Sequence, residues 1–244
     1  MKIVVVFKWM KNPEDAHVGT DGSVDWRNAK MAVSDDDPAA IDIARQLAGG
    51  GDEIIGLTMG DGDAAWAAAR GASSTVIVTD AEMAADAGVA GGVLAAAVRR
   101  IGNVDVVLIG DSAWDVAVPA ALAGQLGWLS LAGVSTVTKH GDRLHATRKL
   151  GESTQVIECA HPAVLAVSAS RAEKDPPGMK EVLMARKKPQ TKVTLSDLGV
   201  TTNGRVKSEG TRIPDTPAAK IIDGADPMAA ATQLVTSLRT EGVL

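Results

Sequence analysis

The sequence predicts an α/β fold built around a doubly wound, mostly parallel sheet. Three apolar strands, at residues 2–7, 54–59 and 104–109, each run into a short loop that carries lysine, glycine or aspartate. Small-residue stretches of helical character follow the last two loops. Strands that end in this way gather backbone N–H groups and helix N-termini at one edge of a parallel sheet. Open α/β sheets bind their ligands at that edge, nucleotides above all.

The elements of the first half alternate between strand and helix. A turn signal at residues 20–23 (TDGS) predicts a small hairpin inside the polar segment 11–32. The run at residues 34–38 (SDDDP) predicts a helix start, because short acceptors, proline and acidic charge all suit a first turn. Further strands and helices are expected at 39–48 (helix), 53–59 (strand), 63–70 (helix), 75–79 (strand), 83–100 (helix), 104–109 (strand) and 117–126 (helix). This alternation is typical of βαβ units and a parallel sheet.

The pattern changes after residue 130. Short strands are expected at 133–138, 143–149, 154–159 and 163–168, and turn signals between them predict an antiparallel extension of the sheet. A short helix is expected at 179–185 and an amphipathic one at 227–241. The polar tail has too few apolar residues to form a core. We therefore expect a domain at residues 1–192 and a C-terminal arm at residues 193–244 that packs on a partner subunit or is partly disordered.

Composition narrows the class of protein. The net charge is −5 and no long basic stretch is present, which disfavours nucleic acid as a partner. The single cysteine, Cys159, cannot form an intrachain disulfide and fits a reducing compartment, and no apolar run reaches the length of a membrane span. A cytoplasmic protein without membrane insertion is therefore expected. The four histidines lack metal-ligand spacing, and no metal is expected. Trp9 and Trp114 follow strand ends, where each would either stack on a ligand ring or cap the rim of the core.

Several segments, in this order, carry a resemblance to a known family. They are KIVVVFKWM at the start, the Asp-rich helix start, the strand ends LTMG and VVLIGDSAWD, then PAALAGQLGW, RKLGESTQVIECAHPAVLAVS and MKEVLMARKKP. Together they resemble the small (β) subunit of electron-transfer flavoproteins over nearly the whole chain. The fold that this resemblance implies is of the adenine-nucleotide-binding type.

The resemblance implies a function without bond-making chemistry in this chain. The small subunit pairs with a larger α subunit that carries a redox-active FAD, and it holds a nucleotide of its own, AMP or a second FAD. It also docks acyl-CoA-type or other flavin dehydrogenases, from which electrons pass to an acceptor. A chain of this kind positions a cofactor and is an electron carrier subunit, with no catalytic residues expected.

The resemblance also assigns site residues. Val6 and Lys8 are expected on the adenine side, Met59 and Gly60 over the ribose, and Met179 at the position of a leucine that docks the dehydrogenase. The remaining positions lie beside the nucleotide or begin its phosphate loop: Ser34, Asp35, Asp36, Asp37, Asp111, Ser112 and Asp115.

The sequence departs from the family pattern at the phosphate loop. The stretch DSAWDVAVPAALAG is shorter than the family's loop, and it carries Val116, Ala117 and Val118 where polar donors are typical. Backbone N–H groups at a helix start can still hold a phosphate. The carboxylates of Asp35, Asp36 and Asp37 would repel one. A nucleotide is therefore expected to bind weakly, to bind differently or to be absent.

Two alternatives stay open at this point. One is a stand-alone adenine-nucleotide-binding regulatory domain, which leaves the long arm without a purpose. The other is a small enzyme acting on an adenylated substrate, for which Asp111 and Asp115 are the candidate bases. Neither aspartate has a histidine or lysine near it in sequence, so this alternative is the weaker one.

Overall fold

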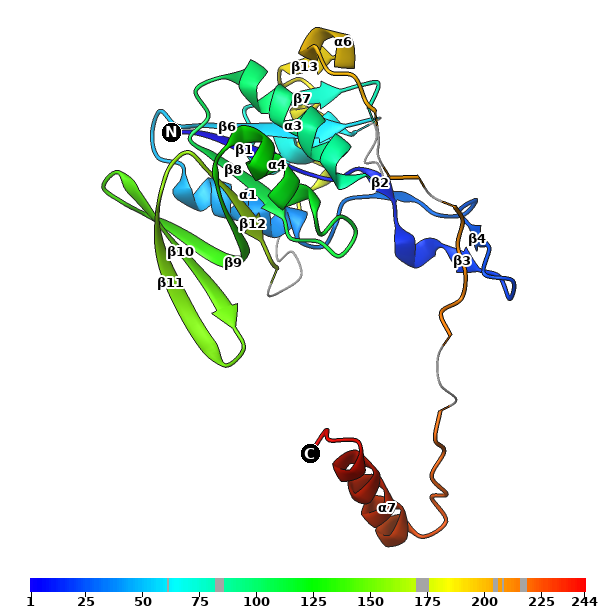
Figure 1. Ribbon diagram of the computed structural model, residues 1–244. Coiled ribbons are helices and arrows are strands. Elements are labelled where there is room, and N and C mark those ends of the chain that lie inside the picture. Colours follow the sequence, from blue (N-terminus) through cyan, green and yellow to red (C-terminus); the bar gives the residue numbers. More distant parts are fainter. Residues whose placement is uncertain (61, 82–85, 170–175, 204–205, 208, 216–218) are drawn as a thin grey trace.

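A central sheet organises the chain in the computed structural model, which describes residues 1–60, 62–81, 86–169, 176–203, 206–207, 209–215 and 219–244. Within these residues nine strands form one sheet in the order β11-β10-β9-β12-β8-β1-β6-β7-β13 (Figure 1). Their bounds in chain order are β1 Lys2–Val6, β6 Glu53–Met59, β7 Ser74–Val78, β8 Val106–Gly110, β9 Leu129–His140, β10 Arg143–Leu150, β11 Ser153–Ala160, β12 Ala163–Val167 and β13 Gln190–Val193. The strands from β12 to β13 are parallel to one another, which confirms the predicted fold class.

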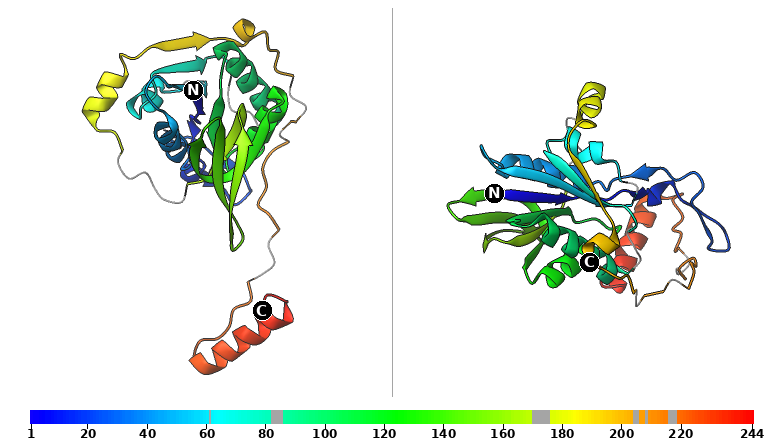
Figure 2. Two further views of the ribbon diagram at one scale, coloured as in Figure 1. Left: turned by 90° about the vertical axis from the view of Figure 1, so that its left-hand side faces the viewer. Right: turned by 90° about the horizontal axis from the view of Figure 1, so that it is seen from above.

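Helices cover both faces of the sheet (Figure 2). On one face α1 (Asp37–Leu47) and Trp66 of α2 (Ala64–Ala69) belong to a first core that also contains Phe7. On the other face α3 (Ala87–Ile101) and α4 (Val118–Leu126) form a second core with the opposite side of the same strands. Strand residues that alternate between two covered faces are apolar throughout, which is why the sequence shows continuous runs rather than alternation.

The strand at residues 163–168 was expected in the antiparallel extension, and this prediction is wrong. β12 pairs in parallel with β8 on one side and with the start of β9 on the other, so it lies inside the parallel sheet. All five of its residues are buried, as a strand covered on both faces requires. The extension itself consists of β9, β10 and β11, which pair antiparallel. Turn signals on both sides of a strand do not reveal whether its partners are its neighbours in sequence.

The N-terminal segment between β1 and α1 contains the predicted hairpin. β3 (His17–Val18) pairs with β4 (Val24–Asp25) around a turn in which Gly22 has φ of 82°. A second pair, β2 (Met10–Lys11) with β5 (Met31–Ala32), and a short 3-10 helix, Pro13–Asp15, complete this segment.

The chain continues to contact the domain beyond residue 192. β13 (Gln190–Val193) is the edge strand next to β7, and α6 (Leu195–Leu198) packs against α3. Further along, the Thr211 hydroxyl donates a 2.7 Å hydrogen bond to the Gly22 carbonyl. The last helix, α7 (Pro227–Thr240), buries no residue and lies apart from the sheet (Figure 1). That residues 193–244 pack on a partner subunit stays a prediction.

Candidate functional site

The candidate site lies at the carboxyl ends of β1 and β8. β1 is flanked by β8 on one side and by β6 on the other, and the chain reaches these strands by connections that run in opposite directions. Ligands of open α/β sheets bind at such a switch point. Lys8 follows β1, the segment 111–117 follows β8, and the N-terminus of α1 faces both.

Lys8 is fully buried and is held by three oxygen atoms. Its Nζ lies 3.3 Å from Asp37 Oδ1, donates a 3.0 Å hydrogen bond to the Gly110 carbonyl, and lies 3.4 Å from Asp115 Oδ1. An ammonium group taken out of water needs partners of this kind. Two carboxylates, of Asp37 and Asp115, therefore lie against the one ammonium group at the centre of the site.

Asp37 joins α1 to the end of β1. Its Oδ2 accepts hydrogen bonds from the backbone N–H of Ser34 at 2.9 Å and of Lys8 at 3.0 Å, and its own exposure is 0%. A Cβ atom at Gly110 would lie 2.7 Å from Asp37 Oδ1, so the last position of β8 must be glycine for this approach. The predicted helix start thus has a second use, because its third acidic residue binds the neighbouring strand end.

Asp36 and Asp111 bind the backbone of other strands. Asp36 accepts a 2.6 Å hydrogen bond from the N–H of Ala169, just after β12, and Asp111 accepts one of 2.8 Å from the N–H of Gly133 in β9. Burial raises the pKa of the Asp36 carboxyl above its ordinary value, although the hydrogen bond from Ala169 opposes this. Together with Asp37, these residues connect β9, β12, β8 and β1, which are neighbours in the sheet.

Asp115 is a buried carboxylate that lacks hydrogen bonds from the described residues. Its side chain is 7% exposed, and neither oxygen accepts a hydrogen bond from a described residue, since Lys8 Nζ lies within ion-pair distance but without hydrogen-bond geometry. Burial raises its pKa from 3.8 to about 6, against the attraction of Lys8. The Ser34 hydroxyl is also buried without a partner among the described residues.

The structure brings most of the predicted nucleotide-site residues together. Lys8, Ser34, Asp36, Asp37, Asp111 and Asp115 surround the switch point through the contacts given above. Ser112 is buried beside them, where its Oγ accepts a hydrogen bond from the Trp114 N–H at 3.1 Å, and Val6 is buried in the second core. Asp35 is exposed.

Met59 and Gly60 lie on the other side of β1, at a neighbouring cavity of about 610 Å³. The cavity is lined by aromatic and thioether side chains with a few polar groups: Trp9, Met10, Lys11, Trp26, Met31, Met59, Gly60, Thr79, Asp80 and Ala81. Trp9 was expected at the strand end. Trp26 and Met31 were missed, because they come from the hairpin segment and no local pattern places that segment over the sheet edge.

A nucleotide phosphate does not fit the switch point as these residues arrange it. The backbone N–H groups of Lys8, Ser34, Gly133 and Ala169 already donate to carboxylates, and the Lys8 ammonium is bound by Asp37 and Asp115. A phosphate would meet carboxylates where it needs donors. A base or other planar ring fits the neighbouring cavity better, because its walls are apolar and aromatic.

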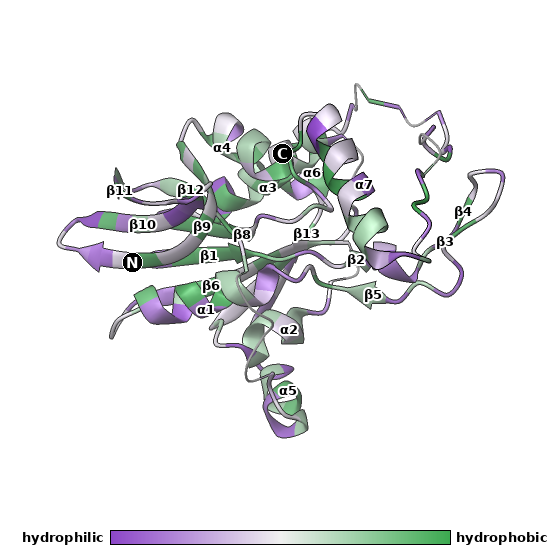
Figure 3. Cartoon of the chain, turned by 90° about the horizontal axis from the view of Figure 1, so that it is seen from below, coloured by the Kyte–Doolittle hydropathy of each residue, from purple (hydrophilic) through white to green (hydrophobic). Residues whose placement is uncertain are grey.

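A second surface lies on α5 (Met179–Ala185), beyond α2 (Figure 3). Its apolar side chains point to solvent: Met179 is 77% exposed, Leu183 53% and Met184 56%. The helix is anchored by the burial of Ala185 and by Lys188, whose Nζ donates 2.8 Å hydrogen bonds to two carbonyls of the α2 region. The predicted docking residue Met179 is therefore accessible on a fixed helix.

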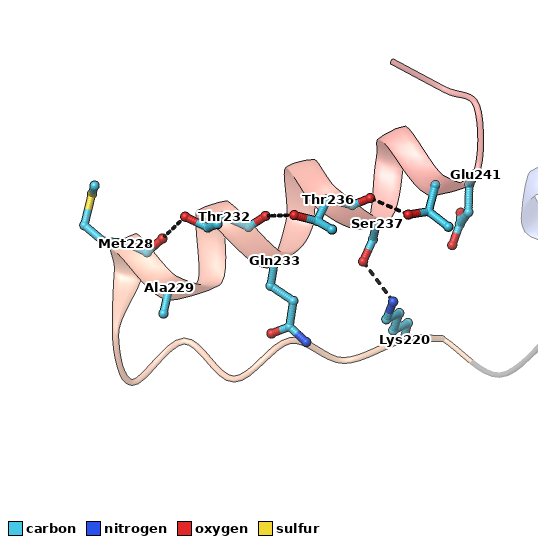
Figure 4. Close-up of a pocket in the computed structure, with 9 residues that line it drawn as sticks. Lys220, Met228, Ala229, Thr232, Gln233, Thr236, Ser237 and Glu241 are labelled. Atoms are coloured by element: carbon cyan, nitrogen blue, oxygen red, sulfur yellow. Dashed lines mark hydrogen bonds between the residues drawn. The ribbon is translucent and has the colours of Figure 1, made fainter.

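A groove lies along α7, in the C-terminal arm (Figure 4). The hydroxyls of Thr232, Thr236 and Thr240 bond to carbonyls of their own helix, and Lys220 Nζ donates a 2.8 Å hydrogen bond to the Ser237 hydroxyl. These bonds occupy the threonine and serine hydroxyls and Lys220, and the other polar side chains that line the groove are Gln233 and Glu241.

Within the described residues, no helix combines the length and the apolar character needed to cross a membrane. In the same part of the chain, no group of three or more histidine, cysteine, aspartate or glutamate side chains is arranged to hold a metal ion.

A family model described as the electron transfer flavoprotein domain matches residues 23–198, which is more than half of the chain. The matched range runs from the N-terminal hairpin to α6 and includes the switch point, β12 and α5.

Proposed function

The chain belongs to the electron transfer flavoprotein family, and we propose that it is the small (β) subunit of a heterodimer in that family. In this proposal the larger α subunit carries the redox-active FAD. Electrons enter from acyl-CoA-type or other flavin dehydrogenases and leave to a separate acceptor. The chain positions its partners and makes or breaks no bond itself.

The observation that carries this proposal is the unpartnered C-terminal arm. α7 buries no residue, and its apolar side chains are exposed to solvent: Met228 is 78% exposed, Leu234 49% and Val235 38%. A 14-residue amphipathic helix gains most of its stability from packing its apolar face. A large partner subunit supplies such a face, whereas a stand-alone regulatory domain does not.

The docking surface on α5 supports the same function. The arm and α5 project from the domain at different places (Figures 2 and 3), so one partner can hold the arm while another contacts Met179. Methionine suits an exposed docking position, because its side chain is flexible and polarizable. We propose that Met179 enters an apolar pocket of the dehydrogenase.

The nucleotide of this chain is the part of the proposal that the site supports least. The family resemblance implies AMP or a second FAD here, beside the proposed site residues. The apolar cavity at Met59 and Gly60 would suit the base, but four backbone N–H groups at the switch point beside it already donate to carboxylates. The FAD of the larger subunit is therefore the cofactor on which the proposed function depends.

The proposed location is the cytoplasm. The single cysteine, Cys159, is buried and cannot form an intrachain disulfide, which fits a reducing compartment.

Co-expression with an electron-transfer flavoprotein α subunit tests the function. We expect the two chains to elute together in size-exclusion chromatography with one FAD, and the complex to accept electrons from a reduced flavin dehydrogenase. A chain that remains a stable monomer in the presence of the α subunit would contradict the proposal and favour the regulatory domain. A complex that contains FAD but accepts no electrons would contradict the carrier role alone.

A further inference from the structure

We propose that the carboxylates of Asp36, Asp37 and Asp111 take the place of a nucleotide phosphate, so that this edge of the sheet is complete without AMP. The inference concerns this chain's own residues and goes beyond the proposed function. In this proposal the three carboxylates also determine specificity, because they exclude phosphate anions from the switch point.

The hydrogen bonds at the switch point carry the first step. An anion at the edge of an open sheet is normally held by backbone N–H groups that have no other partner. Here four such groups donate to side-chain carboxylates over 2.6–3.0 Å. The donors and acceptors are Lys8 and Ser34 to Asp37, Ala169 to Asp36, and Gly133 to Asp111.

The ion pairs carry the second step. Lys8 contacts Asp37 of these carboxylates, and it is fully buried between Asp37, Asp115 and the Gly110 carbonyl. A phosphate would have to displace one of these carboxylates to reach the ammonium group. Its own charge would then lie beside the remaining ones, and like charges repel strongly where water is excluded.

The connections made by these residues carry the third step. Asp37 joins α1 to the end of β1, Asp36 joins it to the chain after β12, and Asp111 joins the end of β8 to β9. A bound anion bridges loops of different strands in the same manner. Because the protein supplies the bridges itself, loss of a nucleotide would leave them intact.

The nucleotide content of the purified heterodimer is the first test. After heat denaturation, chromatography of the released compounds should give one FAD and no AMP per heterodimer. One AMP, or a second FAD, would overturn the inference and leave the proposed function intact. A complex without FAD would contradict the proposed function, and a melting curve of the full chain with added AMP would then decide the inference. No shift of Tm supports it, whereas a saturable rise overturns it.

A substitution provides the second test, by chemical rescue. Asp37→Gly removes the carboxylate, leaves two N–H donors unpaired and leaves the Lys8 ammonium with Asp115 and the Gly110 carbonyl alone. Inorganic phosphate should therefore raise the Tm of the variant by several degrees more than sodium chloride of equal ionic strength does. The wild-type chain and the control Asp35→Ala, at an exposed neighbour, should show no such difference. An equal response of all three chains would contradict the inference.

If Asp37→Gly fails to fold, Asp36→Ala serves in its place. This substitution frees only the N–H of Ala169, which donates a hydrogen bond to Asp36 Oδ1 in the wild type. The same phosphate-dependent rise of Tm is expected, and its absence in a folded variant contradicts the inference.

Discussion

Replacing Asp115 with asparagine should stabilise the protein at neutral pH and leave its stability unchanged in acid. The side chain is 7% exposed, and its oxygens accept no hydrogen bond from a described residue. Its ionised form is therefore poorly solvated, and the attraction of Lys8 at 3.4 Å does not compensate for the burial. An amide of the same shape removes the charge.

The size of the effect follows from the pKa. Folding raises the pKa of Asp115 from 3.8 to about 6, so the folded state holds this proton more tightly than the unfolded state. Stability is thus full below pH 3.8 and is lost as the pH rises through the interval up to about 6. At about 1.4 kcal/mol per pKa unit, ionisation of Asp115 costs about 3 kcal/mol above that interval. Asp115→Asn should recover up to this amount.

Urea unfolding followed by tryptophan fluorescence measures the effect, because the chain has five tryptophans. The difference in unfolding free energy between Asp115→Asn and the wild type should be near zero at about pH 3 and should grow to a plateau above about pH 6.5. Asp35→Asn, at an exposed position, is the matched control and should show no such growth. A difference that is constant with pH, or a variant less stable than the wild type at neutral pH, would refute the reasoning.

Three further predictions concern the core, the docking helix and the arm. Phe7→Ala should lower the unfolding free energy by about 3–5 kcal/mol, since Phe7 is fully buried and stacks on Trp66 at 4.9 Å between ring centroids; a loss below about 1 kcal/mol would contradict this packing. Met179→Asp should leave the urea midpoint unchanged but slow electron transfer from the dehydrogenase at least about tenfold, as loss of a buried apolar anchor does; an unchanged rate would exclude Met179 from docking. Removal of residues 219–244 should leave the Tm of the chain unchanged and abolish co-elution with the α subunit, and a lowered Tm would show that the arm packs on its own domain.

Much of the fold could be predicted because its signals are local. The strand runs, the hairpin turn with Gly22 at positive φ, and the helix start at Asp37 each depend on residues a few positions apart. Periodicity, capping and turn conformation act over that distance, so a single sequence suffices to predict them. The order of the segments was also enough to identify the family, which the match over residues 23–198 confirms.

The candidate site was predicted as a set of residues but not as an arrangement. The sequence indicated that Lys8, the three consecutive aspartates and the segment after β8 gather at one edge. It also indicated that acidic residues there would oppose a phosphate. It could not indicate that Asp37 would bind Lys8 from 29 positions away, or that Asp36 would reach the N–H of Ala169 across 133. Such contacts depend on how the strands are ordered in the sheet.

The sequence by itself therefore determined most of the strands and helices as far as α5, and the family to which the chain belongs, but it predicted neither β13 nor α6. Tertiary structure decided the rest: that β12 is inserted in parallel between β8 and β9, that β13 closes the sheet beside β7, and that Trp26 and Met31 line a cavity with Met59. The physical reason is that strand pairing and loop packing are chosen among distant segments by burial and hydrogen bonding of the whole chain. No local pattern of residues encodes that choice.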